Sequence, residues 1–282
     1  MTTILTWNIQ CGRGCGGRVD LARIAGVIRA MGDHDVICLQ EVCRHTPELD
    51  DGAATDQVAD LGRLFPEFEP VFGAAIDRAG DPGGPRRQFG NLILSRLPVV
   101  QAFRHALPQP ADASVKHMPR QATEVVVPRH HNSASGPWLR IVTTHLEYHS
   151  KAQRLAQAAR LLELQAEITG NQESPPIAPP NGPYAAIPRP ASGILCGDFN
   201  IAVGGDVYNR LIGGGNDAWP LVHQRPHDPT CGIFDRTQWP QGEHCRDFFF
   251  VSPDLVEAVT GLNVDLKTDA SDHQPLRLVL SD

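Results

Sequence analysis

Four short blocks of polar residues, well separated along the chain, carry side chains that bind hard metal ions or transfer protons. The blocks are Thr6-Trp7-Asn8-Ile9, Leu39-Gln40-Glu41, Gly197-Asp198-Phe199-Asn200 and Ser271-Asp272-His273. Each block follows a short apolar run typical of a strand, so its side chains are expected at strand ends, where open sheets usually place active sites. Four such blocks in one chain predict a single metal-assisted active site that is assembled by folding.

The oxygen-bearing residues indicate a hard divalent cation. Glu41 and Asp272 are carboxylates that follow apolar runs, and Asn8 supplies a neutral oxygen. Such ligands suit Mg²⁺ or Mn²⁺ more than zinc, and few are needed because Mg²⁺ keeps several waters. A lone glutamate after a strand would more often be a helix cap or part of a surface ion pair. The matching contexts of Asp272 and Asp198 favour a site for Mg²⁺, with Mn²⁺ as the alternative.

Asp198 and Asn200 lie two residues apart after Gly197. In an extended segment such residues point to the same side, so one could accept a proton from water while the other donates to an oxyanion. The same Asp-x-Asn spacing is well suited to an Asx-turn. Both interpretations can hold at once.

Two histidines complete the set of candidate catalytic residues. His145 follows Thr143-Thr144 at a strand end, and His273 follows Asp272 directly. A histidine that acts on a phosphate should be oriented by a carboxylate, and Asp247 is the best candidate partner. A lone histidine is more often structural, and that alternative stays open.

The seven cysteines are scattered, at positions 11, 15, 38, 43, 196, 231 and 245. Their odd number does not indicate a disulfide framework. Cys11, Cys15 and Cys43 lie just after two of the strands that lead to the site and could meet as a zinc site, but no close pair spacing supports this over ordinary loop thiols.

Composition narrows the class of protein. The 282 residues are 41% hydrophobic and 20% charged, which suits a folded domain with a real core. The formal net charge of −7 argues against broad nonspecific binding to duplex nucleic acid. No secretory signal and no apolar run of membrane-spanning length is visible, so a cytoplasmic location is expected.

Helix and strand patterns alternate through both halves of the chain. Residues 3–8, 36–39, 92–94, 125–127, 139–143, 194–196, 248–251 and 276–280 have the pattern of strands. Asp20 is expected to cap a helix through Leu21, Ile24, Ile28 and Met31 that stops at Gly32, and Val58, Leu61 and Leu64 indicate another. This alternation suits two packed sheets with helices outside.

The clearest helix begins at Ser150, with Gln153 completing a capping box. Its predicted apolar stripe is Leu155, Ala159, Leu162 and Ala166, and Gly170 should end it. Residues 171–192, which contain seven prolines, then predict a surface loop or lid. Blocks of the site lie on both sides of this loop, so residues 1–282 are expected to form a single domain.

Taken together, the motifs resemble the endonuclease/exonuclease/phosphatase superfamily, which is DNase I-like. The matching segments, in the family order, are Thr-Trp-Asn-Ile at 6–9, Leu-Gln-Glu-Val at 39–42, Gly-Asn-Leu-Ile-Leu-Ser at 90–95, Thr-His-Leu at 144–146, Gly-Asp-Phe-Asn at 197–200, Arg-Asp-Phe-Phe-Phe-Val-Ser at 246–252 and Ser-Asp-His at 271–273. The fold that this resemblance implies is an α/β, four-layer sandwich of two packed mixed β-sheets flanked by helices.

The resemblance also implies roles for the candidate residues. It makes Glu41 the principal metal ligand with Asn8 and Asp272 beside it, Asp198 the water-activating carboxylate and Asn200 a phosphate contact. His145 resembles the histidine of the nuclease and sphingomyelinase branches, and Asp247 and His273 resemble the Asp–His pair of the family.

Two further residues are expected to contact substrate. Arg120 stands where members often place a phosphate-facing arginine, although a surface arginine is equally compatible with the sequence. Asn91 is expected to line the cleft, or else to be a structural amide at a strand start. The usual Arg-x-Asp-Tyr block of the family reads Cys245-Arg246-Asp247-Phe248 here, so the contacts of its arginine and tyrosine are in doubt.

The predicted function is therefore a Mg²⁺-dependent phosphoesterase that hydrolyses a phosphodiester by in-line attack of water. The substrate would be nucleic acid, or a lipid or small-molecule phosphoester. The alternatives are a phosphomonoesterase and a catalytically silent binding module on the same fold, and the second would be expected to lack ligands that this chain retains. No protein partner can be inferred.

Overall fold

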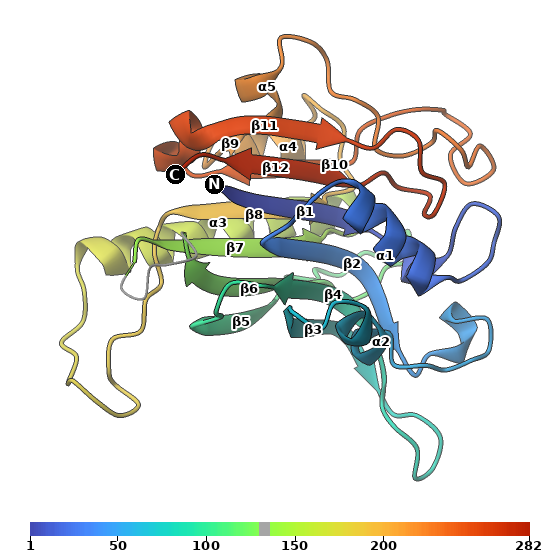
Figure 1. Ribbon diagram of the computed structural model, residues 1–282, viewed down its shortest axis with the longest axis horizontal. Coiled ribbons are helices and arrows are strands. Elements are labelled where there is room, and N and C mark those ends of the chain that lie inside the picture. Colours follow the sequence, from blue (N-terminus) through green and yellow to red (C-terminus); the bar gives the residue numbers. More distant parts are fainter. Residues whose placement is uncertain (130–135) are drawn as a thin grey trace.

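The computed structural model describes residues 1–129 and 136–282, which form two packed six-stranded sheets (Figure 1). The first sheet has the order β11-β12-β1-β2-β4-β3, and the second has the order β5-β6-β7-β8-β10-β9. Both are mixed, because β1–β2 and β7–β8 are parallel pairs and the other pairs are antiparallel. This is the α/β sandwich that the sequence predicted.

The strands are β1 (Thr2–Asn8), β2 (Val36–Arg44), β3 (Glu69–Arg78), β4 (Arg87–Ser95), β5 (Gln101–Ala106), β6 (Gln121–Pro128), β7 (Trp138–His145), β8 (Gly193–Asp198), β9 (Asn216–Asp217), β10 (Asp247–Val251), β11 (Val259–Val264) and β12 (Leu276–Leu280). The helices are α1 (Leu21–Ala30), α2 (Gln57–Leu64), α3 (Lys151–Glu173), α4 (Asp206–Ile212), α5 (Trp219–Val222) and the short 3₁₀ turns η1 (Gln10–Gly12), η2 (Pro47–Leu49) and η3 (Pro253–Ala258). The predicted strands are all present. The strands β3, β5, β9 and β11 and the helices α4 and α5 were not predicted.

Alternating side chains of the central strands build three apolar layers. In β1, Ile4 packs between the two sheets, whereas Leu5 and Trp7 pack on the opposite face under α1 and α2. A third cluster joins the outer face of the second sheet to α3 and α4. Strands buried on both faces have nearly continuous apolar sequences, which explains why a central strand such as β1 was easy to predict.

The helix ends follow local chemistry. The Asp20 side chain accepts a hydrogen bond from the Arg23 N–H, and the Ser150 hydroxyl accepts one from the Gln153 N–H, so both predicted N-caps are confirmed. The Gln153 amide does not close the predicted capping box, because its Nε2 donates to the Pro110 carbonyl.

Two predictions about α3 were wrong. The helix continues past Gly170 to Glu173, so the proline-rich loop begins after that residue. The buried face carries Gln157, Leu161, Leu164 and Ile168 rather than the predicted stripe. Gln157 is buried because its amide accepts from the Glu147 N–H and donates to the Pro108 carbonyl. Because a polar glutamine lies in the buried face, polarity does not mark this face in the sequence.

The proline-rich loop lies far from the predicted site. It joins the end of α3 to Gly193, the first residue of β8, whereas Asp198 is the last residue of that strand. In Figure 1 it extends from the left end of the structure. Its base is attached through Arg189 to Glu124 and through the Ala191 N–H to Gln172, and residues 174–184 are exposed. Of the two alternatives, surface loop and lid, its position supports the first.

Candidate active site

The carboxyl ends of three parallel-running strands meet at one edge of the sandwich. Asn8 ends β1, His145 ends β7 and Asp198 ends β8, with His145 directly opposite Asp198 in the register of the second sheet. Asp247 begins the antiparallel strand β10 and also pairs with Asp198. The topology therefore brings residues that are up to 239 positions apart (8 to 247) to one place.

A cavity of about 480 Å³ opens at this edge. It is lined by Glu41, Lys116, His117, Met118, Arg120, His145, Glu147, Tyr148, His149, Asp198, Asn200, Gln238, Trp239, Asp272 and His273. Seven of the predicted site residues line this cavity, and Asn8 and Asp247 contact them from behind.

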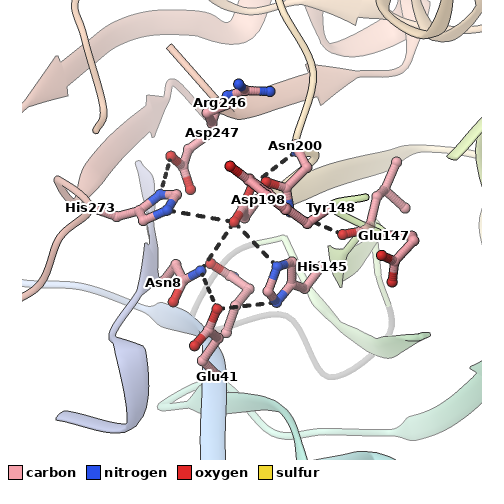
Figure 2. Close-up of polar contacts among 12 residues, drawn as sticks. Asn8, Glu41, His145, Glu147, Tyr148, Asp198, Asn200, Arg246, Asp247 and His273 are labelled. Atoms are coloured by element: carbon pink, nitrogen blue, oxygen red, sulfur yellow. Dashed lines mark hydrogen bonds and ion pairs between the residues drawn. The ribbon is translucent and has the colours of Figure 1, made fainter. Parts of the chain in front are cut away.

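Asp198 is the hub of the polar contacts (Figure 2). Its Oδ2 accepts a hydrogen bond from Asn8 Nδ2 at 3.1 Å and lies 3.3 Å from His145 Nε2 and 3.7 Å from His273 Nε2. Its Oδ1 accepts from the Asn200 N–H at 2.9 Å, which is the Asx-turn predicted for this segment. Burial raises the pKa of Asp198, and His273 opposes this shift.

The backbone around these groups is specialised. Gly197 has a φ of 131°, and a Cβ there would lie 2.0 Å from the Thr144 carbonyl oxygen, so only glycine allows β8 to approach β7 before Asp198. Glu41 was expected at a strand end, but β2 continues to Arg44. Instead, Glu41 lies at a break in register between Leu39 and Val42, with a φ of 57°. The bulge turns the glutamate toward the cavity.

His273 and Asp247 form the predicted pair. His273 Nδ1 lies 2.8 Å from Asp247 Oδ2, which also accepts a hydrogen bond from the Thr230 hydroxyl. Burial acts to lower the pKa of His273, but the negative charges of Asp247, Asp198 and Asp272 outweigh it and raise this pKa well above its usual value. These negative charges favour the protonated ring of His273, the form that donates a hydrogen bond from both nitrogens.

His145 has the opposite character. Burial, together with the positive charges of Arg120 and His273, lowers its pKa well below the usual range. His145 Nε2 faces Asp198, and Nδ1 lies 3.8 Å from Glu41 Oε1. A neutral imidazole here can orient neighbouring groups without competing for the charge of a phosphate.

Glu41 and Asp272 form the acidic side of the cavity. Burial and then the charge of Asp272 raise the pKa of Glu41 to about 7, although a hydrogen bond from Asn8 opposes the shift. Burial also raises the pKa of Asp272, whose Oδ2 accepts hydrogen bonds from Gln238 Nε2 at 2.7 Å and Trp239 Nε1 at 3.2 Å. A half-buried and a buried carboxylate, Glu41 and Asp272, that oppose each other's ionisation have the chemistry of a site for a hard cation.

Asn8 reaches the site but presents its amide nitrogen to the carboxylates. Its Nδ2 donates to Glu41 and Asp198, and its Oδ1 accepts from the Gln10 N–H at 3.0 Å. In this orientation Asn8 holds the two acids in place. That Asn8 binds a metal ion through its side-chain oxygen stays a prediction.

The two residues predicted to bind substrate differ in placement. Arg120 lines the cavity, with its Nε 3.2 Å from Glu147 Oε2 and its buried Nη1 without a hydrogen-bond partner. Asn91 is buried away from the cavity lining, and its Nδ2 donates to the Gln121 carbonyl. Its position fits the structural alternative.

Several residues of the site escaped the sequence analysis, chiefly Tyr148, Gln238, Trp239 and Thr230. Tyr148 follows the Thr-His-Leu segment closely, which was the one available signal. The others lie in the irregular stretch between α5 and β10, where no periodicity marks them.

The three cysteines considered for zinc do not converge. Cys11 and Cys43 pack with Phe89 in a small apolar cluster, and Cys15 Sγ contacts the Ser271 carbonyl. Within residues 1–129 and 136–282, the one group of three His, Cys, Asp or Glu side chains close enough to share an ion is Asp198, Asp247 and His273, whose ligand atoms lie within 4.8 Å of one another. No helix in the described part of the chain is long and apolar enough to cross a membrane.

Comparison with solved structures shows the same fold in several bacterial proteins. An endonuclease/exonuclease/phosphatase from Beutenbergia cavernae matches with a TM-score of 0.71 and 24% identity, over 99% of this chain and 72% of that one. A mannosyl-6-phosphatase from Bacteroides thetaiotaomicron matches with a TM-score of 0.69 and 19% identity, over the whole of both chains. A 3′ phosphatase from Neisseria, bound to product DNA hairpin, matches with a TM-score of 0.63 and 19% identity, also over both whole chains.

A search among curated proteins finds no match to this sequence. The sequence profile of the Endonuclease/Exonuclease/phosphatase family, in contrast, matches residues 5–273. That interval contains every site residue discussed above, from Asn8 to His273. The chain belongs to the Endonuclease/Exonuclease/phosphatase family, whose members are hydrolases that act on phosphoesters.

Proposed function

We propose that this protein is a metal-dependent phosphodiesterase. The observation that carries the proposal is that one cavity is lined both by two carboxylates, Glu41 and Asp272, and by two hydrogen-bond donors, His273 and Arg120. A cation bound by the carboxylates, together with the donors, would hold a phosphate. The hub carboxylate, Asp198, lines the same cavity.

Glu41 and Asp272 are the residues that would hold Mg²⁺ or Mn²⁺. Their mutual repulsion, which contributes to the raised pKa of Glu41, would be relieved by a divalent cation. The alternative group of Asp198, Asp247 and His273 is less suitable, because the raised pKa of His273 favours a protonated ring that cannot bind a metal. When bound, the ion would neutralise charge on the phosphate and on the leaving oxygen.

Asp198 is the candidate general base. Its raised pKa brings a carboxylate closer to the value at which it accepts a proton from water efficiently. Asn8 and His145 contact Oδ2 and would fix the direction of that oxygen. The attacking water would then be aligned with the bond to the leaving group before reaction.

The developing negative charge would be stabilised by fixed donors. His273, protonated and held by Asp247, points its Nε2 toward the side of the cavity where Asp198 lies. Arg120 contributes its Nη1, which has no hydrogen-bond partner among the residues that the structure describes, and Asn200 contributes an amide whose Nδ2 donates to the Leu146 carbonyl. Donors that are already in position cost no reorganisation during the reaction.

A metal-dependent assay tests the proposal. We expect hydrolysis of bis-p-nitrophenyl phosphate with Mg²⁺ or Mn²⁺, and loss of that hydrolysis on addition of a chelator. Glu41→Gln should weaken metal affinity, measured by calorimetry, by roughly 10–100-fold, and excess metal should restore part of the turnover. Metal-independent hydrolysis, or unchanged metal affinity in this variant, would contradict the assignment.

A phosphomonoesterase is the second candidate, because two of the proteins with this fold are named as phosphatases. The comparison of bis-p-nitrophenyl phosphate with p-nitrophenyl phosphate separates the two functions. A panel of single- and double-stranded DNA, RNA, sphingomyelin, inositol phosphates and sugar phosphates would then identify the substrate class. A silent binding module would hydrolyse none of them.

A further inference from the structure

A second cavity lies beside the catalytic one, and Arg246 stands between them. This cavity has a volume of about 310 Å³, and Ala202, Val203 and Arg246 form part of its wall. The Arg246 guanidinium lies 5.8 Å from the ring centre of Trp239, which lines the catalytic cavity. In Figure 2 Arg246 lies beyond Asp247 and Asn200, on the side away from Glu41.

Arg246 lacks a counterion. Within the described ranges it forms no ion pair, and its buried Nε has no hydrogen-bond partner. The histidines of the second cavity are already engaged, since His244 contacts the Gly242 carbonyl and Cys231 Sγ, and His227 lies 2.7 Å from Asp217. Leaving a buried donor unsatisfied costs free energy, and an anionic ligand would remove that cost.

Arg154 supplies a second cation next to Arg246. Its Nη1 donates to the carbonyls of Glu147 and Tyr148, two residues that line the catalytic cavity. The Tyr148 ring lies 5.9 Å from the ring of Trp239, the same ring over which the Arg246 guanidinium lies, so both arginines contact one aromatic pair. Consistent with this placement, burial and then the positive charge of Arg246 lower the pKa of Arg154. Arg154 also forms no ion pair with a carboxylate among the residues that the structure describes.

We propose that Arg246 and Arg154 form a second anion subsite, which binds an additional phosphate group carried by the same substrate as the scissile ester. Two guanidinium groups without carboxylate partners can bind phosphate through several charge-assisted hydrogen bonds. The inference rests on the proposed function, because it places the reacting phosphate in the adjoining catalytic cavity. It predicts a substrate that bears at least two phosphate groups.

Non-hydrolysable phosphonates test the subsite without requiring turnover. The probes are alkane-α,ω-bisphosphonates with one to four methylene groups, each compared with the alkylphosphonate of the same length. Binding is measured by calorimetry with Mg²⁺ in excess over the ligand. At the spacer length that spans the two cavities, we expect the bisphosphonate to bind roughly tenfold tighter than its monophosphonate.

Substitution identifies the residues responsible. Arg246→Gln and Arg154→Gln should each bring the ratio of the two affinities close to one. Arg29→Gln is the matched control, since Arg29 also stacks on an aromatic ring, Phe65, but lies on the exposed side of α1. The control should keep the wild-type ratio. Circular dichroism and melting curves check that each variant is folded.

The outcomes separate this inference from the proposed function. Equal affinities of the two probe classes at every spacer length would overturn the subsite, as would a preference that survives in both arginine variants. Failure of the wild-type protein to hydrolyse any phosphoester would refute the proposed function alone, because the calorimetric preference for two phosphonates would still be measurable.

Discussion

Glu124 and Asp198 are buried carboxylates of the same sheet, two strands apart. Their surroundings differ in the charge of the groups that contact them. Glu124 contacts a histidine and two arginines: His105 at 2.8 Å, Arg189 at 2.9 Å and Arg140 at 3.9 Å. Although burial opposes this, the hydrogen bonds from His105 and Arg189 lower the pKa of Glu124 to about 2. Burial instead raises the pKa of Asp198, and the nearby Asp247 adds to the rise.

The difference teaches that burial alone does not distinguish a structural carboxylate from a functional one. Both residues are 1% exposed. The Glu124 cluster is neutralised by its own arginines and joins the proline-rich loop to β6. The carboxylates of the site, by contrast, are neutralised only in part by protein groups, which leaves them available to a cation and to a proton.

The largest expected effect concerns Asp198→Asn. Turnover should fall roughly 10²–10⁴-fold, the usual contribution of a general base, because asparagine cannot accept the proton of water. Metal affinity should stay near the wild-type value, since Glu41 and Asp272 remain. The stability of this variant should rise, because a buried charge with a raised pKa is removed. Steady-state kinetics, calorimetry and urea unfolding measure the three quantities, and a parallel loss of metal affinity would show that Asp198 is a ligand.

Glu124→Gln should lower stability and leave turnover unchanged, which is the reverse of the effect of Asp198→Asn. Removing one partner of a buried ion pair leaves Arg140, which is 5% exposed, without its counterion, so we expect a loss of about 3 kcal/mol in the free energy of unfolding. The kcat at a temperature where the variant is folded should be unchanged within about twofold, since Glu124 lies outside the catalytic cavity. A variant as stable as the wild type would mean that Arg140 and Arg189 find other partners.

The acid dependence of stability should separate the same two clusters. The folded-state pKa of Glu124, about 2, lies below the ordinary value of 4.5. Its contribution to stability is therefore complete above pH 4.5 and is lost as the pH falls toward 2. Urea unfolding at pH 5.0 and 3.5 should show a smaller decrease for Glu124→Gln than for the wild type. An identical decrease in both proteins would assign the acid sensitivity to other carboxylates.

Much of the site could be predicted because its polar residues follow short, strongly apolar strands. Asn8, His145 and Asp198 end such strands, so the periodicity that predicts the strand also places the side chain. Glu41 was predicted to reach the site from the end of a strand, whereas it reaches the site from a bulge within β2. The bulge depends on the pairing with β4, which the sequence of β2 alone does not reveal. Gln238 and Trp239 could not be found, since irregular segments are positioned by tertiary contacts rather than by periodicity. The buried face of α3 was missed because Gln157 satisfies its amide inside the protein.

The smallest expected effect concerns the proline-rich loop. Deleting residues 176–186, which are exposed apart from the half-buried Ala185, should change the free energy of unfolding by less than about 1 kcal/mol, because loop-closure entropy depends weakly on length. Arg189 is retained in this deletion, so the Glu124 cluster stays complete. Melting curves and hydrolysis of the substrate panel check the result. A changed substrate range would indicate a lid, in contradiction to the position of the loop.

The positive φ of Glu41 has a consequence for attempts to make this protein more thermostable. A glutamate in the left-handed region carries a conformational cost of roughly 1 kcal/mol that a glycine would avoid. A screen that selects only for resistance to heat would therefore favour glycine at this position and discard the carboxylate that faces the cavity. Any engineering programme on this scaffold should fix position 41 in advance and look for stability in the α1 and α2 layer, which lies on the far side of the first sheet.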